Sequence, residues 1–360
     1  MYLSVFQEKY ELKSNIKLYA REDPPGSRFD KTNHQIIKKT PQQLMKTKIL
    51  SLIAIVTVSF ALSAQAQQNT PVEEGVSAPI TSVPNLGSFE ADYTYSPFKI
   101  DGKDMNIQQV NGNLTLPLYS KMQNGKVDFF LAGVGYSGLF LSGMGNQFGG
   151  DNFHSFSVPL TFQKALSPKY ALLISAVPTL SSDLKDISGN DMLYTGVAML
   201  KIRKSAKFTY SIGVVYSKQF FGSVLVPVFG IDWNISDKLS LSGTIPVSEK
   251  LNYKLSKKSN FGLSGDFGIG GGTYRLSKKM NSDYFQAQQF KASLYYNYAL
   301  AKNFSVEVSA GYNVVQKLDL YDKDQKVNWV PFNNLDKRGA PLTELKKTGV
   351  AVSTGINYRF

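Results

Sequence analysis

Apolar and polar residues alternate along most of the chain from Phe89 onward. The clearest stretch is residues 350–360, where Val350, Val352, Ile356 and Tyr358 occupy even positions and small or polar residues occupy the odd ones. A period of two places successive side chains on opposite faces of a β-strand. The pattern therefore predicts a terminal strand with one apolar and one polar face.

The same alternation predicts about fourteen strands between residues 87 and 360, with a count of twelve as the alternative. Short turns are expected near residues 121, 166, 205, 237, 257 and 302, and the opposite connections near 101, 147, 186, 221, 249, 280 and 335. Short turns at one end, mostly longer loops at the other and an even strand count are typical of outer-membrane barrels. We expect an all-β fold, a transmembrane antiparallel up-and-down β-barrel. A soluble sandwich would explain the alternation but not the loop asymmetry.

The segment that precedes the barrel has the features of a secretory signal peptide. Lys46 and Lys48 follow Met45, a run of fourteen mostly apolar residues covers 49–62, and Ala64-Gln65-Ala66 is a small-residue cleavage site. Such a run is too short for a spanning helix. We expect export through a peptide at 45–66 that is cleaved.

Three further boundaries follow from that peptide. Residues 1–44 match nothing downstream and are interpreted as an upstream extension from a misassigned start codon; the alternative is a cytoplasmic tail before an uncleaved anchor. Residues 67–86 are polar, with three prolines, and predict a periplasmic leader. The barrel itself is assigned to 87–360.

Composition fits short amphipathic strands. The chain holds 20 Tyr, 23 Phe and 29 Gly, with 19% charged residues. Cysteine is absent, which excludes disulfides, thiolate metal sites and a lipid-anchored amino-terminal cysteine. The formal net charge of the chain is +13, and lysines are concentrated in the expected short turns. The sequence contains no basic-aromatic nucleic-acid module. We expect no nucleic-acid partner.

The last strand, with Tyr358 and the terminal Phe360, resembles the closing strand of bacterial outer-membrane barrels. The resemblance implies that Tyr358 and Phe360 form the signal that the barrel-assembly machinery reads. It also implies outer-membrane lipid and lipopolysaccharide as the surroundings of the barrel.

A second resemblance covers the whole chain after the signal peptide. Pro246, the LNYKL stretch at 251–255 and the TYRL stretch at 273–276 are similar to an outer-membrane β-barrel family of Gram-negative bacteria whose members have no known function. The motifs are loose, and the resemblance implies a barrel without contributing any catalytic residue.

Three motifs with chemical potential have simpler structural interpretations. Gly133 to Gly138 matches G-x-G-x-x-G, but a strand continues after it where a nucleotide site needs a helix. His154 is a general base for a lipid hydrolase only if a nucleophile lies near it, and Ser155 would face the other side of the strand. Asp319, Asp322 and Asp324 fail the calcium-loop spacing. We expect no catalytic residue, no metal and no cofactor.

The polar face of the strands carries the informative residues. If the apolar face meets lipid, charges of both signs point into the lumen. The lumen-facing candidates are Glu90, Asp92, Lys201, Asp232, Lys254, Asp266, Lys291, Glu307 and Arg359.

These charges favour a passive channel or transporter for small solutes, since pore-lining charge sets selectivity. The alternative is a structural or surface-interaction barrel whose lumen is plugged by its own side chains. A transporter for hydrophobic solutes is a variant of the first, and Leu172, Ile174 and Val197 would supply its apolar inner face only locally. The remote alternative is an outer-membrane lipid hydrolase that uses His154.

Overall fold

The computed structural model describes residues 87–267, 272–331 and 338–360. The upstream extension, the signal peptide and the leader lie outside the described residues. Within them, strands dominate, joined in places by three short 3₁₀ turns: η2 (Gly145–Phe148), η3 (Gly189–Asp191) and η4 (Lys278–Met280). In this part of the chain no helix is long and apolar enough to cross a membrane.

The strands follow one another in a single antiparallel series with two short parallel additions. They are β1 (Ser88–Ile100), β2 (Lys103–Gln123), β3 (Lys126–Ser142), β4 (Asn152–Ser157), β5 (Leu160–Ala165), β6 (Tyr170–Ser182), β7 (Met192–Arg203), β8 (Phe208–Gln219), β9 (Gly222–Asn234), β10 (Leu239–Ile245), β11 (Ser248–Lys254), β12 (Ser259–Phe267), β13 (Gly272–Arg275), β14 (Tyr284–Ala301), β15 (Phe304–Tyr321), β16 (Val327–Pro331) and β17 (Thr343–Arg359).

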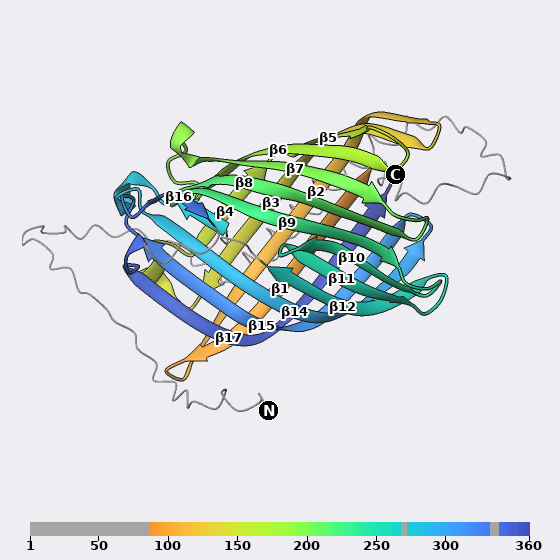
Figure 1. Ribbon diagram of the computed structural model, residues 1–360. Helices are drawn as coiled ribbons and strands as arrows, with labels where there is room; N and C mark the ends of the chain where they lie inside the picture. The colour runs from red at the N-terminus through yellow and green to blue at the C-terminus, as the bar shows by residue number, and fades with distance from the viewer. Residues whose placement is uncertain (1–86, 268–271, 332–337) are drawn as a thin grey trace, which may run out of the picture. The chain divides into compact units, whose positions relative to one another are not determined.

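The sheet closes on itself as a fourteen-stranded barrel (Figure 1). β17 pairs with β1 from Arg359↔Ser88 to Val352↔Tyr95, so the series has no free end. β4 and β5 together pair with β3 and β6 as one interrupted strand, and β12 and β13 pair in turn with β14. The prediction of about fourteen strands in an antiparallel barrel is confirmed.

Turn chemistry explains the tight connection between β2 and β3 at one end of the barrel. At Asn124-Gly125 both residues have positive φ, 52° and 71°, the conformation that a two-residue hairpin requires and that Asn-Gly adopts readily. This end, which also holds Phe360, is called the short-turn end; the opposite one is called the long-loop end. At the short-turn end Phe360 N–H donates to Gly87 O at 3.1 Å.

The outward face carries the apolar half of the alternation. Leu116, Leu263, Leu294 and Val350 are each at least 40% exposed although they are aliphatic. Exposure of so many apolar side chains over a whole wall would be unfavourable in water and suits a lipid environment.

Two residues expected on an apolar inner face point outward. Leu173 lines an inner cavity, so its neighbours Leu172 and Ile174 lie on the opposite face, where they are 36% and 47% exposed. This removes support for an apolar inner wall at these positions.

Three strands are too short to reach the long-loop end. β10 and β11 have seven residues each and β12 has nine, whereas β9 has thirteen and β14 has eighteen. β9 and β14 extend beyond these short strands, and other segments of the chain pair with the edges that would otherwise be free. β16 pairs in parallel with β9 from Gly222 to Leu225, and β13 pairs with β14. The sequence predicts a single connection near residue 335, without a strand in it; β16 corrects that prediction, and β17 begins at Thr343.

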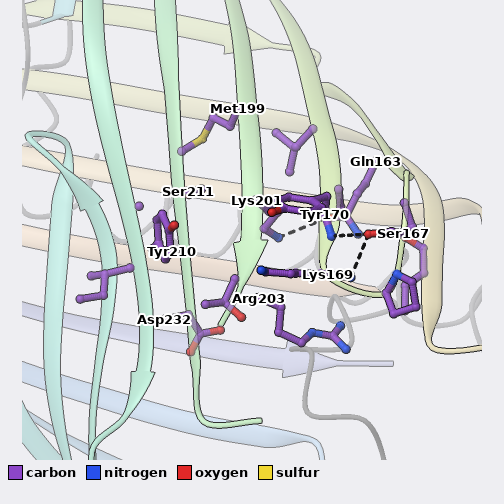
Figure 2. Close-up of a pocket in the computed structure, with 18 of the residues that line it drawn as sticks. Gln163, Ser167, Lys169, Tyr170, Met199, Lys201, Arg203, Tyr210, Ser211 and Asp232 are labelled. Carbon is purple, nitrogen blue, oxygen red and sulfur yellow. Dashed lines mark hydrogen bonds between the residues drawn. The ribbon is translucent and has the colours of Figure 1, made fainter. Parts of the chain in front are cut away.

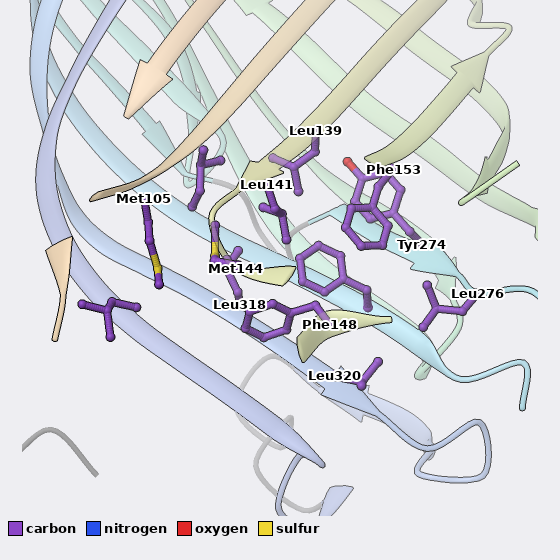
Figure 3. Close-up of a cluster of buried hydrophobic side chains, with 13 residues drawn as sticks. Met105, Leu139, Leu141, Met144, Phe148, Phe153, Tyr274, Leu276, Leu318 and Leu320 are labelled. Atoms are coloured by element: carbon purple, nitrogen blue, oxygen red, sulfur yellow. The ribbon is translucent and has the colours of Figure 1, made fainter. Parts of the chain in front are cut away.

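Buried apolar side chains gather inside the long-loop end (Figure 3). Phe148, Phe153 and Phe285 are fully buried, and the rings of Phe153 and Phe285 stack with centroids 4.2 Å apart. We call this group the apolar plug. Its members are Ile100, Met105, Ile107, Leu139, Leu141, Met144, Phe148, Phe153, Tyr274, Leu276, Phe285, Leu318 and Leu320.

The plug makes a prediction about stability. Phe285→Ala removes a ring that contacts protein on all sides and leaves a cavity, so we expect the free energy of unfolding to fall by about 3–5 kcal/mol. The matched change Phe261→Ala removes an outward ring whose place flexible detergent tails can fill, and should cost clearly less. Urea titration of the refolded protein in detergent micelles measures both. Equal losses would show that the plug does not contribute as a packed core.

Candidate functional site

A polar cavity of about 560 Å³ lies inside the barrel, among the residues that the structure describes. Its wall comes from β1, β2, β11, β12, β14, β15 and β17, whose polar faces point inward. Four carboxylates and two lysines line it, together with asparagine, glutamine and serine side chains. The charged residues are Glu90, Asp92, Lys250, Asp266, Lys291 and Glu307. We call this cavity the acidic chamber.

The two lysines compensate only part of the acidic charge. Lys250 Nζ lies 3.2 Å from Glu307 Oε1, and strand pairing sets Lys291 beside Asp266. Glu90 and Asp92 instead accept hydrogen bonds from the neutral amides of Asn357 and Asn111, at 2.7 and 2.9 Å. Amide contacts order a carboxylate without neutralising it, so the chamber keeps an excess of two negative charges.

A second cavity of about 270 Å³ lies at the short-turn end, against β5 to β9 (Figure 2). Lys169, Lys201 and Arg203 line it with a single carboxylate, Asp232. Lys201 Nζ donates to Gln163 Oε1 at 3.2 Å, while Arg203 Nε is buried with no hydrogen-bond partner in the described part of the chain. This basic pocket therefore carries an excess of two positive charges.

The structure separates the nine lumen-facing candidates into three groups. Five line the acidic chamber and two, Lys201 and Asp232, line the basic pocket. Lys254 and Arg359 are the last residues of β11 and β17, at the short-turn end, and line neither cavity. Lys250 and Arg203 complete the two cavities. Both lie on the polar face by the same alternation that selected the nine, so the sequence signal for them was present.

The long-loop end is crossed by a strap that consists of β13 and the η4 turn, residues 272–283. From its pairing with β14 the strap reaches β6, where Arg275 pairs in parallel with Ser182. Ser181 Oγ donates to Thr273 O at 2.6 Å, and Asp183 N–H donates to Arg275 O at 3.1 Å. The strap holds Tyr274 and Leu276 in the apolar plug.

A buried ion pair fastens the strap to the β6–β7 connection. Arg275 Nε lies 3.0 Å from Asp191 Oδ1, and Arg275 Nη1 lies 3.5 Å from Asp186 Oδ1. The side chain of Asp191 is fully buried, and that burial raises the pKa of its carboxyl although Arg275 and the Ser188 N–H act in the opposite direction. A buried pair of this kind is strongly destabilising when one partner is lost, because the other charge stays buried.

A second fastening joins the last connection to the wall beside it. The guanidinium of Arg338 lies between the rings of Phe221 and Tyr321, 4.8 and 4.3 Å from their centroids. Arg338 Nη1 also donates to Gln286 Oε1 at 2.7 Å. These contacts hold the residues around β16 against β9, β14 and β15, over the short strands β10 to β12.

His154 occupies an aromatic girdle on the outer face. Its Nδ1 lies 2.9 Å from Tyr136 Oη, and the rings of Tyr136 and Phe140 flank it. Ser155 points inward and shares a hydrogen bond with Ser181 Oγ at 2.8 Å. The two side chains thus lie on opposite faces of β4, which offers no nucleophile–base contact between them.

The other two motifs also have structural roles. Gly133 to Gly138 lies within β3, which continues to Ser142. Asp319 is buried and pairs with Lys317 Nζ at 3.1 Å, while Asp322 caps its own turn by accepting from Asp324 N–H. Among the described residues no group of three or more acidic or histidine side chains is close enough to hold a metal ion.

Comparison with known proteins places the chain in one family. The family model described as "Domain of unknown function (DUF6268)" matches residues 89–359. No curated protein matches the chain.

Several solved structures of outer-membrane proteins are similar at low identity. A FadL homologue from Pseudomonas aeruginosa has 10% identity and a TM-score of 0.39, covering 76% of this chain and 90% of its own. An outer membrane channel from Pseudomonas putida F1 has 10% identity and a TM-score of 0.36, covering 80% of this chain and 100% of its own. The Pseudomonas putida toluene transporter TodX has 10% identity and a TM-score of 0.32, covering 77% of this chain and 90% of its own. At these scores the likeness carries no information about function.

The strap makes a prediction about protease protection. Arg275→Met keeps the length of the side chain but leaves Asp191 without its cation, so the strap should detach from β6 more often. We expect trypsin to cleave after Lys278 or Lys279 at least about tenfold faster than in the unaltered protein, since each 1.4 kcal/mol is a factor of ten in an equilibrium. Lys99→Met, which breaks a pair that is exposed on both sides, is the control. Unchanged cleavage in Arg275→Met would mean that the ion pair does not hold the strap.

Proposed function

We propose a gated passive channel for small polar solutes as the function of this chain, which belongs to the DUF6268 family, a family whose description assigns no activity. The observation that carries the proposal is the presence of two charged cavities along the inner wall. Both cavities are lined by ionisable side chains that a packed interior would exclude.

Small inward residues keep that space open. Ser264, Ser309, Ser353 and Gly355 line the acidic chamber where large apolar residues would fill it. The charged side chains are also accessible: those of Lys250 and Glu307 are 48% and 34% exposed although they point into the barrel. Accessible charge on a closed inner wall supports a lumen filled with water.

The strap and the plug supply the gate. In the closed arrangement they fill the long-loop end, while the charged cavities lie on the other side of the plug. Release of Arg275 from Asp191 would free the strap from β6 and withdraw Tyr274 and Leu276 from the plug. The resulting passage would join the cavities to the long-loop side.

The apolar outer face supports a place in the bacterial outer membrane, after export with the cleaved signal peptide. Outer-membrane lipid and lipopolysaccharide would then cover the outward residues, with the short-turn end in the periplasm. The barrel-assembly machinery would bind β17 through Tyr358 and Phe360. We propose no enzymatic activity and no cofactor.

A specific observation favours the second candidate, a structural or surface-interaction barrel. The apolar plug is packed like a protein core, with six of its side chains fully buried. If the plug never opens, the barrel would act through its loops on a partner rather than through its lumen.

Planar-bilayer recording of the refolded protein, residues 67–360, separates the two candidates. The unaltered protein should open rarely, and Arg275→Met should raise the open probability by about tenfold or more, because the closed state loses a buried ion pair. Asp266→Asn should shift ion selectivity toward anions, whereas Asp104→Asn, at an exposed pair outside the lumen, should not. Folded, heat-modifiable barrels that stay silent in both forms would support the structural candidate.

Assembly gives an independent test of location. Deletion of Phe360 removes the terminal ring that stacks on Tyr358, with centroids 6.0 Å apart. We expect most of the folded barrel to disappear from outer-membrane fractions, while refolding in detergent stays near that of the full chain. Tyr298→Ala, an outward aromatic at the same end, serves as control. Normal outer-membrane levels after the deletion would contradict a role for Phe360 in assembly.

A further inference from the structure

The two charged cavities lie on facing walls of the lumen. β7 carries Lys201 and Arg203, and β15 carries Glu307. In the order of the fourteen-stranded barrel, β7 and β15 are seven strands apart in either direction, which is the widest separation a closed barrel of this size allows. A basic patch therefore faces an acidic wall across the lumen.

The opposed charges also lie at a similar depth. Lys201 is two residues from the end of β7 at the short-turn end, and Glu307 is three residues from the start of β15 at the same end. Asp92, four residues from the start of β1, extends the acidic wall at this level. A solute that enters from the short-turn end meets both signs of charge at once.

The two excesses are equal and opposite. The basic pocket holds three cations and one carboxylate, and the acidic chamber holds four carboxylates and two lysines. Low-dielectric walls focus the field between such patches across the lumen. A solute with a single charge gains on one wall and loses on the other, whereas a solute that carries both charges can orient so that each end meets its opposite.

We propose that the lumen is selective for small zwitterionic solutes that carry an ammonium and a carboxylate at opposite ends, such as short peptides or amino acids. The carboxylate end binds toward Lys201 and Arg203, two of the three cations that line the basic pocket. The ammonium end binds toward Asp92 and Glu90, which accept hydrogen bonds from the neutral amides of Asn111 and Asn357. This inference rests on the proposed channel function and names its substrate class.

Liposome swelling with the open variant Arg275→Met tests the inference. The probes are glycylglycine, a zwitterion, and erythritol, an uncharged solute of similar size. We expect glycylglycine to enter about tenfold faster than erythritol, the lower end of the enrichment that a charged cleft produces. Two double variants, Lys201→Met with Arg203→Gln and Asp92→Asn with Glu90→Gln, should each bring the two rates close to equality. Lys254→Met removes a charge at the short-turn end that lines neither cavity, and it should leave the ratio unchanged.

The outcomes separate the inference from the proposed function. Entry of neither solute would contradict the channel itself. Entry of both solutes at equal rates through Arg275→Met, with every cavity residue unchanged, would overturn the zwitterion preference and leave the channel in place. Reversal potentials provide a check on folding of the variants: loss of the basic pair should shift selectivity toward cations, and loss of the acidic pair should shift it toward anions. A shift in the same direction for both would also overturn the opposed-wall arrangement.

Discussion

The rest of the structure depends on the pairing of β17 with β1. A strand edge leaves unpaired N–H and C=O groups, and within a membrane such groups have no water to satisfy them. When Arg359 pairs with Ser88 and Val352 with Tyr95, the last edge disappears and the sheet becomes a wall. Closure then gives every strand an inside and an outside, and a period of two in the sequence becomes a division between lumen and surroundings.

Closure is incomplete where β10, β11 and β12 stop short, and the chain compensates with its own segments. β16 covers the free edge of β9, and β13 covers that of β14 before it crosses to β6. The same segments that satisfy the edges also bring Tyr274, Leu276 and Arg338 into the long-loop end. A missing part of the wall is thereby coupled to the closure of the lumen, which explains why the strap is fastened by buried charge.

The lumen combines two environments that would be incompatible in a single core. At the long-loop end Phe153 and Phe285 stack in an apolar cluster, while nearer the short-turn end Asp232 and Glu307 line polar cavities. Separation along the barrel axis allows both, because the apolar end packs as a core while the charged end keeps its polar cavities. Neighbours support some residues of the charged end: Lys250 pairs with Glu307, and Lys201 donates to Gln163.

The sequence by itself determined the barrel and a strand number of about fourteen, because alternation and turn residues such as Asn124-Gly125 act over a few residues. It missed β16 and the plug. At the long-loop end apolar residues occupy both odd and even positions, as in Leu139-Phe140-Leu141. In β15 a bulge between Asn313 and Gln316 also switches which positions face inward. Alternation therefore no longer distinguishes inside from outside at this end. Only the tertiary structure decided that Arg275 meets Asp191, and that Lys201 faces Glu307. These pairs are 84 and 106 positions apart in the chain, and their approach depends on how the closed sheet and its strap fold in space.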